Sequence, residues 1–113
     1  MKGEGIMKKI YLFCSQGMST SLLASKMQKV ADAHKLPIEV KAFPHGTIES
    51  VVMEEHPDCI LLGPQVKYLY NETMVKFKDL NTPIAVINTE DYGMMNGEKV
   101  LKHAIMLIKN NKK

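Results

Sequence analysis

Four short apolar runs alternate with segments of helical periodicity, and this alternation constrains the fold more than any other feature of the chain. The runs cover residues 9–13, 38–42, 59–62 and 84–87, each about as long as one β-strand. The segments between them place apolar residues at steps of three and four, which predicts amphipathic helices. Strand and helix repeated four times predict an α/β fold, in which helices cover both faces of a parallel sheet.

The periodicity also predicts which side chains each helix buries. After the fourth run, residues 88–97 are expected to form a turn region. Thr47 is placed to cap the second helix at its start. The expected apolar faces are Leu22, Leu23, Met27, Val30, Ala31 and His34 in the first helix, Ile48, Val51 and Val52 in the second, Val66, Tyr70, Met74 and Phe77 in the third, and Val100, Leu101, Ala104, Ile105 and Ile108 in the last.

The pattern within each run predicts the order of the strands. The first and third runs are apolar on both faces, which is typical of central strands, whereas residues 38–42 alternate apolar and charged as an edge strand does. An open sheet of order 2-1-3-4 satisfies both observations. Ligands of such sheets bind beyond the carboxyl ends of the strands, where the strand order reverses. The fold prediction therefore directs attention to Cys14, which follows the first run.

Length and composition are those of one ordinary domain. The chain has 113 residues, 45% of them hydrophobic, so it needs neither disulfides nor a metal to fold. We expect a single domain over residues 7–109, because Met7 stands just before the first run. Residues 1–6 are then an N-terminal extension that need not be ordered, and residues 110–113 a basic tail. No cofactor is implied.

Charge and hydropathy exclude several functional classes. All 15 basic residues are lysine, and the excess lies at the two ends, since residues 10–101 carry 8 lysines against 11 acidic residues. A nucleic-acid binder concentrates its basic residues along one element, so that function is disfavoured. No apolar run approaches the roughly 18–20 residues of a membrane span. The N-terminus lacks the apolar core of a secretory signal, so a cytoplasmic location is expected.

The segment from Cys14 to Ser21 carries the strongest chemical signal. It lies between a strand and a helix and contains one glycine and four hydroxyl residues. The N–H groups at a helix N-terminus attract anions, Gly17 lets the main chain approach a ligand, and the hydroxyls can donate to phosphoryl oxygens. The same field favours thiolate over thiol at Cys14, as a nucleophile requires. The phosphoryl-binding loop is predicted to comprise Ser15, Gln16, Gly17, Met18, Ser19, Thr20 and Ser21.

Three other interpretations of this segment stay open at this point. Cys14 could be a small buried residue in an ordinary turn, or the loop could bind an anion without catalysis. A low-molecular-weight cysteine phosphatase or an arsenate-reductase-like enzyme is the third, but phosphatases of similar plan use C-x5-R to hold the phosphate. Thr20 occupies the arginine position here. Hydrolysis needs such a clamp more than phosphoryl relay does, so its absence favours a carrier.

At these residues the chain resembles the IIB components of the bacterial sugar phosphotransferase system (PTS), in the lactose/cellobiose/chitobiose class. The resemblance runs from Met7 to about Lys109. It is most specific in the string from Ile10 to Ser21, where Cys-Ser-x-Gly-Met-Ser-Thr-Ser ends a strand, and continues in Leu61-Leu62-Gly63-Pro64-Gln65 and more weakly in Tyr92-Gly93. The fold that it implies is similar to that of low-molecular-weight tyrosine phosphatases.

The resemblance implies a function and two partner proteins. A IIA protein would donate phosphate from its phosphohistidine to Cys14, which would pass it to a β-disaccharide of the cellobiose, chitobiose or lactose type held by the membrane protein IIC. The carrier would be cytoplasmic and peripheral to the membrane through IIC. Gln65 and Tyr92 follow the third and fourth strands, at the same sheet edge as Cys14, and are candidates for the rim of the site or a partner contact.

The remaining reactive side chains point to ordinary roles. Cys59 lies within a buried run and is expected to be a structural thiol. The four histidines are scattered without metal-ligand spacing, so no metal site is predicted. Asp91 would be the general acid of the phosphatase alternative, although an exposed loop aspartate is the simpler interpretation.

Overall fold

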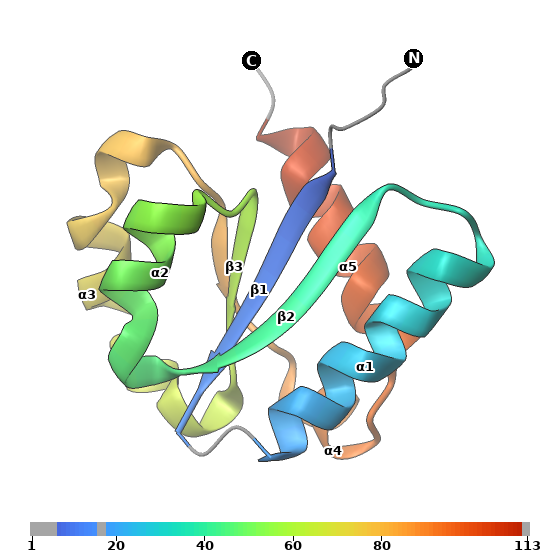
Figure 1. Ribbon diagram of the computed structural model, residues 1–113. Coiled ribbons are helices and arrows are strands. Elements are labelled where there is room, and N and C mark those ends of the chain that lie inside the picture. The colour runs from blue at the N-terminus through green and yellow to red at the C-terminus, as the bar shows by residue number, and fades with distance from the viewer. Residues whose placement is uncertain (1–6, 16–17, 112–113) are drawn as a thin grey trace.

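Four parallel strands form one sheet in the order β2-β1-β3-β4, which confirms the predicted α/β class and strand order (Figure 1). The computed structural model describes residues 7–15 and 18–111. Its strands are β1 (Lys8–Cys14), β2 (Ile38–Pro44), β3 (Cys59–Leu62) and β4 (Ile84–Val86), and its α-helices are α1 (Met18–Ala33), α2 (Ile48–Glu55), α3 (Tyr70–Lys76), α4 (Thr89–Gly93) and α5 (Gly97–Asn110).

The central strand β1 divides its side chains between two apolar layers. Ile10 and Leu12 face α1 and α5, whereas Tyr11 and Phe13 face the opposite layer, which contains α2 and the 3₁₀ helix Pro64–Leu69. All four side chains are fully buried. Successive strand residues point to opposite faces, so a central strand must be apolar on both sides. Figure 1 shows α1 and α5 on one side of the sheet and α2 and α3 on the other.

A glutamine of α1 occupies part of the open edge of β2. The Gln28 amide nitrogen donates to the carbonyl oxygen of Ile38 at 2.9 Å, and its side-chain oxygen accepts from the backbone N–H of Val40 at 2.8 Å. The amide thus replaces a neighbouring strand at these two positions. Unpaired edge groups invite pairing with other chains, and Gln28 satisfies two of them within the molecule.

Two helical faces differ from the predicted ones. In α1, Leu22 is 53% exposed and Ala24 is buried, although the prediction had Leu22 on the buried face. His34 lies beyond the end of α1. In the third helical segment Met74 is 40% exposed and Thr73 is buried. In this third segment the chain kinks at Val66, where φ is −119° and ψ is 28°, inside the 3₁₀ helix Pro64–Leu69 that precedes α3. The 3.6-residue register counted from Val66 therefore does not continue into α3.

Two further predictions about local structure were wrong. Thr47 does not cap α2 through its side chain, because it belongs to the 3₁₀ helix His45–Thr47 and its hydroxyl donates back to the carbonyl oxygen of Pro44 at 2.8 Å. Residues 88–97 contain a short helix, α4, rather than only a turn. Asn88 is the N-cap residue of α4, since its side-chain oxygen accepts a hydrogen bond from the backbone N–H of Asp91.

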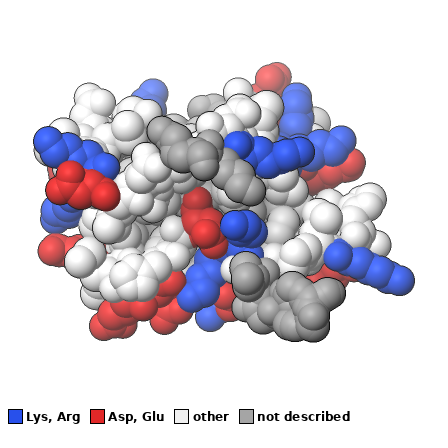
Figure 2. Space-filling model, turned by 90° about the horizontal axis from the view of Figure 1, so that it is seen from above, with Lys and Arg blue, Asp and Glu red and all other residues white. Residues whose placement is uncertain are grey.

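All strands run in one direction, so their carboxyl ends lie together at the lower edge of Figure 1, where α1 and α4 begin. The opposite edge is seen in Figure 2, where lysine and acidic side chains are interspersed. The described residues include ion pairs such as Lys9–Glu55 and Lys76–Glu49, both at 3.3 Å. None of the helices in the described part of the chain is long and apolar enough to cross a membrane.

Gly97 allows α5 to lie against the backbone of α1. A Cβ atom at Gly97 would lie 2.9 Å from Cβ of Lys26 and 3.0 Å from the backbone nitrogen of Met27, closer than real Cβ contacts. Because the obstacle includes backbone, Gly97→Ala is expected to push α5 away from α1 and lower the free energy of unfolding by about 1–3 kcal/mol in urea titration.

The matched control is Gly93→Ala, since a Cβ atom at Gly93 meets no heavy atom within 4 Å. Its free energy of unfolding should stay the same or rise by up to about 1 kcal/mol. Equal losses in the two variants would contradict this account of the α1–α5 contact.

Candidate functional site

Cys14 is the last residue of β1, at the carboxyl edge of the sheet and beside the point where the strand order reverses. Its parallel partner on β2 is Pro44, and α1 begins four residues later at Met18. The chain leaves β1 through α1 toward β2 on one side, while β3 lies on the other side. The edge position predicted for this cysteine is therefore the observed one.

The side chain of Cys14 continues the face of Ile10 and Leu12, under the layer formed by α1 and α5. Cys14 is 1% exposed, so its sulfur is not an open surface group. Cys14 is not a member of either apolar cluster of the described residues, and the next residue, Ser15, is exposed. Cys14 thus lies buried at the end of the strand, one residue before the exposed surface of this edge.

Gly63 makes room for Cys14 and Gln65. Its backbone N–H donates to the carbonyl oxygen of Phe13 at 2.8 Å, which extends the pairing of β3 with β1. A Cβ atom at this position would lie 3.3 Å from Cβ of Cys14 and 2.5 Å from Oε1 of Gln65. The dihedral angles of Gly63, φ −64° and ψ 154°, suit any residue, so space rather than backbone conformation accounts for a glycine here. Sequence reasoning assigned Gly63 no role beyond its place in the string from Leu61 to Gln65 that resembles the IIB family.

Three predicted site residues meet through hydrogen bonds. Nε2 of Gln65 donates to the hydroxyl oxygen of Tyr92 at 2.8 Å, and that hydroxyl lies 3.1 Å from Oγ1 of Thr20. Thr20 is fully buried in the first turn of α1, Gln65 is exposed after β3, and Tyr92 is half-buried in α4. The carboxyl ends of separate strands thus bring three distant segments together, as parallel topology allows.

The other loop residues are placed less completely. Ser15 and Ser21 are both exposed, on either side of the loop. Gln16 and Gly17 lie outside the described residues, and so do the side chains of Met18 and Ser19. The phosphoryl-binding role predicted for this loop stays a prediction.

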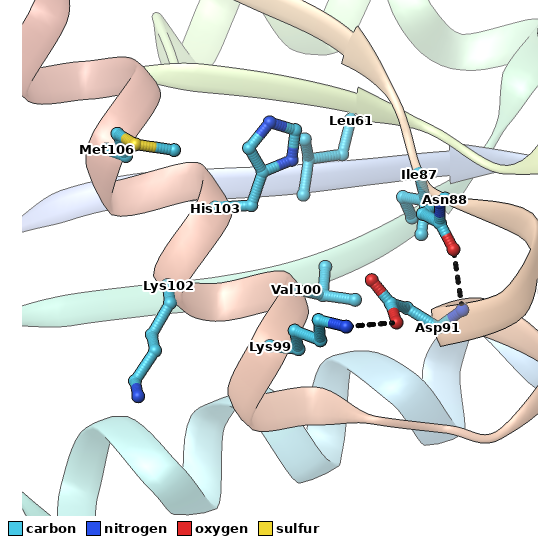
Figure 3. A pocket seen from close by; sticks show the side chains of 9 residues that line it. All are labelled: Leu61, Ile87, Asn88, Asp91, Lys99, Val100, Lys102, His103 and Met106. Atoms are coloured by element: carbon cyan, nitrogen blue, oxygen red, sulfur yellow. Dashed lines mark hydrogen bonds and ion pairs between the residues drawn. The ribbon is translucent and has the colours of Figure 1, made fainter.

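Asp91 faces α5 rather than the hydrogen-bonded residues around Cys14. Its carboxylate lies 3.6 Å from Nζ of Lys99, and its side chain is 18% exposed. Figure 3 shows the pair at a hollow of about 460 Å³ between α4, α5 and the ends of β3 and β4, which His103 and Met106 also line. A phosphatase would need this acid beside its thiol; here it is engaged by a lysine on another helix.

Cys59 is a core residue. It is fully buried in β3, and burial, with a smaller contribution from the nearby Asp58 carboxylate, raises the pKa of its thiol to about 12. Tyr11 is affected in the same direction: burial and then Glu39 raise the pKa of its hydroxyl to about 12. Among residues 7–15 and 18–111, no three His, Cys, Asp or Glu side chains gather where they could hold a metal ion.

Comparison with protein families gives a match over nearly the whole domain. Residues 9–103 match the family described as PTS system, Lactose/Cellobiose specific IIB subunit. The chain belongs to this family. The match includes Cys14, Gln65 and Tyr92, together with all four strands except the first residue of β1.

Curated relatives of this IIB subunit carry names from the same system. It is 43% identical over 100 residues to the galactose-specific EIIB component of Lactococcus lactis subsp. cremoris, covering 86% of this chain and 93% of that one. The cellobiose-specific EIIB component of Lactococcus lactis subsp. lactis gives the same figures. The oligo-beta-mannoside-specific EIIB component of Bacillus subtilis is 36% identical over 104 residues, covering 92% of this chain and 99% of the relative.

Solved structures share the fold of the IIB subunit. The cellobiose-specific IIB component of Borrelia burgdorferi aligns with a TM-score of 0.77 and 35% identity, over 96% of this chain and 98% of that one. The lactose-specific IIB domain of Streptococcus pneumoniae aligns with a TM-score of 0.80 at 19% identity, over 89% and 97% of the two chains, which shows the fold alone. The IIB subunit thus has a sugar phosphotransfer role, and the phosphatase alternative is not favoured.

The raised pKa of Cys59 gives a test of the difference between the two thiols of this IIB subunit. In a Cys14→Ser variant, Cys59 is the only thiol. At pH 8 a thiol of pKa about 12 holds roughly a thousandfold less thiolate than one near 9, and burial slows access further. Alkylation by iodoacetamide should therefore be more than about a hundredfold slower in the folded variant than in the same variant unfolded in urea.

The alkylation is followed by mass spectrometry. Equal rates in the folded and unfolded protein would show that Cys59 is not the inert core thiol described here. Cys59→Ser, which retains only Cys14, provides the comparison for a thiol at the sheet edge.

Proposed function

We propose that Cys14 is the phosphoryl acceptor of this IIB subunit, forming a phosphocysteine intermediate between IIA and a sugar bound by IIC. The single observation that carries the proposal is the place of Cys14, at the carboxyl end of the central strand and four residues before α1 begins. Membership of the family supplies the reaction class. The cysteine is the nucleophile that this edge offers at the switch point.

The first step transfers phosphate from IIA. The Cys14 thiolate attacks the phosphorus atom of the IIA phosphohistidine in line, so an S–P bond forms as the N–P bond breaks. The imidazole leaves with the electron pair and takes up a proton. The N-terminus of α1 offers a positive field for the incoming charge. Because Cys14 is 1% exposed, the donor can reach the sulfur only when this edge opens locally as IIA docks.

The second step regenerates the carrier. A sugar hydroxyl held by IIC attacks the phosphorus atom, an O–P bond forms, and the S–P bond breaks to return the thiolate; the hydroxyl proton passes to a base of the acceptor complex. The chain contains no arginine that could grip the phosphate, so the phosphocysteine is not held too tightly to be passed on. Such a relay would work at the cytoplasmic face of the membrane.

The sugar is expected to be a β-disaccharide or a related sugar of the lactose/cellobiose class. Relatives of similar identity are named for galactose, cellobiose and oligo-beta-mannosides. This spread at similar identity agrees with specificity that resides in IIC rather than in the carrier.

The proposal is tested by incubating the protein with a radiolabelled, phosphorylated IIA of the lactose/cellobiose class. The wild-type chain should take up close to one phosphate on Cys14, and Cys14→Ser should show only background label, because a serine hydroxyl is scarcely ionised and is a far weaker nucleophile at neutral pH. Cys59→Ser is the matched control and should be labelled as the wild type is, since Cys59 lies inside the sheet.

Label that persists in Cys14→Ser would refute the assignment. Turnover of a small aryl phosphate distinguishes the phosphatase alternative: the carrier should release almost no aryl alcohol, whereas sustained turnover that requires Cys14 would favour hydrolysis.

A further inference from the structure

The hydroxyl of Tyr92 joins two segments that border the loop after Cys14. It accepts a hydrogen bond from Nε2 of Gln65 at 2.8 Å, because an amide nitrogen can only donate, and lies 3.1 Å from Oγ1 of Thr20. It is the middle member of a chain that runs from the turn after β3 to the first turn of α1. The three residues are separated by up to 72 positions in the sequence.

One end of this hydrogen-bonded chain follows Cys14 in the sequence, and the other adjoins it in space. Thr20 is six residues after Cys14 and fully buried, so it fixes where α1 starts relative to the rest of the edge. At the other end, Gln65 folds back over Gly63, where a Cβ atom would lie 2.5 Å from Oε1 of Gln65 and 3.3 Å from Cβ of Cys14. Gln65 and Cys14 thus share the space that Gly63 leaves open.

We propose that Tyr92 is a positioning residue for phosphoryl transfer: its hydroxyl ties Thr20, in the first turn of α1, to Gln65, after β3, and so fixes these two segments relative to each other beside Cys14. This inference rests on the proposed function of Cys14. The tether acts by holding the first turn of α1 against the segment after β3, and it needs no contact between Tyr92 and the phosphoryl group. Small errors in the placement of reacting groups slow a reaction severely. The hydrogen bonds of the Tyr92 hydroxyl can therefore affect the transfer rate more than they affect the stability of the fold.

The ring and the hydroxyl of Tyr92 have separable roles. The ring packs at the margin of the apolar cluster under α1 and α5, which anchors α4. Only the hydroxyl reaches Thr20 and Gln65. Tyr92→Phe therefore removes the tether and keeps the packing, so the variant is expected to fold.

The test measures the rate of transfer from phosphorylated IIA over a range of IIA concentrations. For Tyr92→Phe the maximal rate should fall between about tenfold and a hundredfold, while the half-saturating IIA concentration stays within about twofold of the wild-type value. Tyr68→Phe is the matched control, because Tyr68 is 69% exposed in the 3₁₀ helix after β3. It should transfer at the wild-type rate. Urea unfolding confirms that each variant is folded in the assay.

A double-substitution cycle tests whether the three side chains act as a unit. Gln65→Ala and Thr20→Val should each slow the maximal rate, and either one combined with Tyr92→Phe should be no slower than Tyr92→Phe alone. If the fold-losses in maximal rate of the single variants multiply in the double variants, the residues act independently and the tether is overturned.

The outcomes separate this inference from the proposed function. If the wild-type chain accepts phosphate on Cys14 but Tyr92→Phe transfers at the wild-type maximal rate, the tether is wrong and the carrier stands. A change confined to the half-saturating concentration would make Tyr92 a partner contact and also overturn its positioning role. If the wild-type chain takes no label on Cys14, the proposed function itself fails.

Discussion

The burial of β1 on both faces and along both edges is the constraint on which the rest of the structure depends. Its residues pair with β2 on one side and β3 on the other, and its side chains alternate between two apolar layers. No other strand of the described chain is paired on both edges and also feeds both layers along so great a length. The strand ends at Cys14, which is itself buried, one residue before the exposed Ser15.

The described part of the site is built by close approach of side chains at the sheet edge. Gly63 lets Cys14 and Gln65 approach each other, and the hydroxyl of Tyr92 links Gln65 to the start of α1. The hollow of about 460 Å³ beside α5 is lined by Asp91, Lys99 and His103 and not by these residues.

Much of the fold could be predicted from the sequence because the responsible signals are local. The both-faced apolar runs around Ile10 and Ile60 and the alternating run around Glu39 predicted centre and edge correctly. Errors arose where neighbouring turns changed the register. The kink at Val66 moved one buried position from Met74 to Thr73, and the 3₁₀ turn that contains Thr47 redirected its hydroxyl.

The sequence alone determined the order of the strands, the family resemblance and the identity of the cysteine at the switch point, since each depends on residues close together along the chain. The tertiary structure decided that Cys14 is almost fully buried, that a side chain at Gly63 would crowd Cys14 and Gln65, and that Thr20, Gln65 and Tyr92 form one hydrogen-bonded chain. Those relations join segments that meet only because parallel strands gather their carboxyl ends at one edge, and no local pattern records the distances between them.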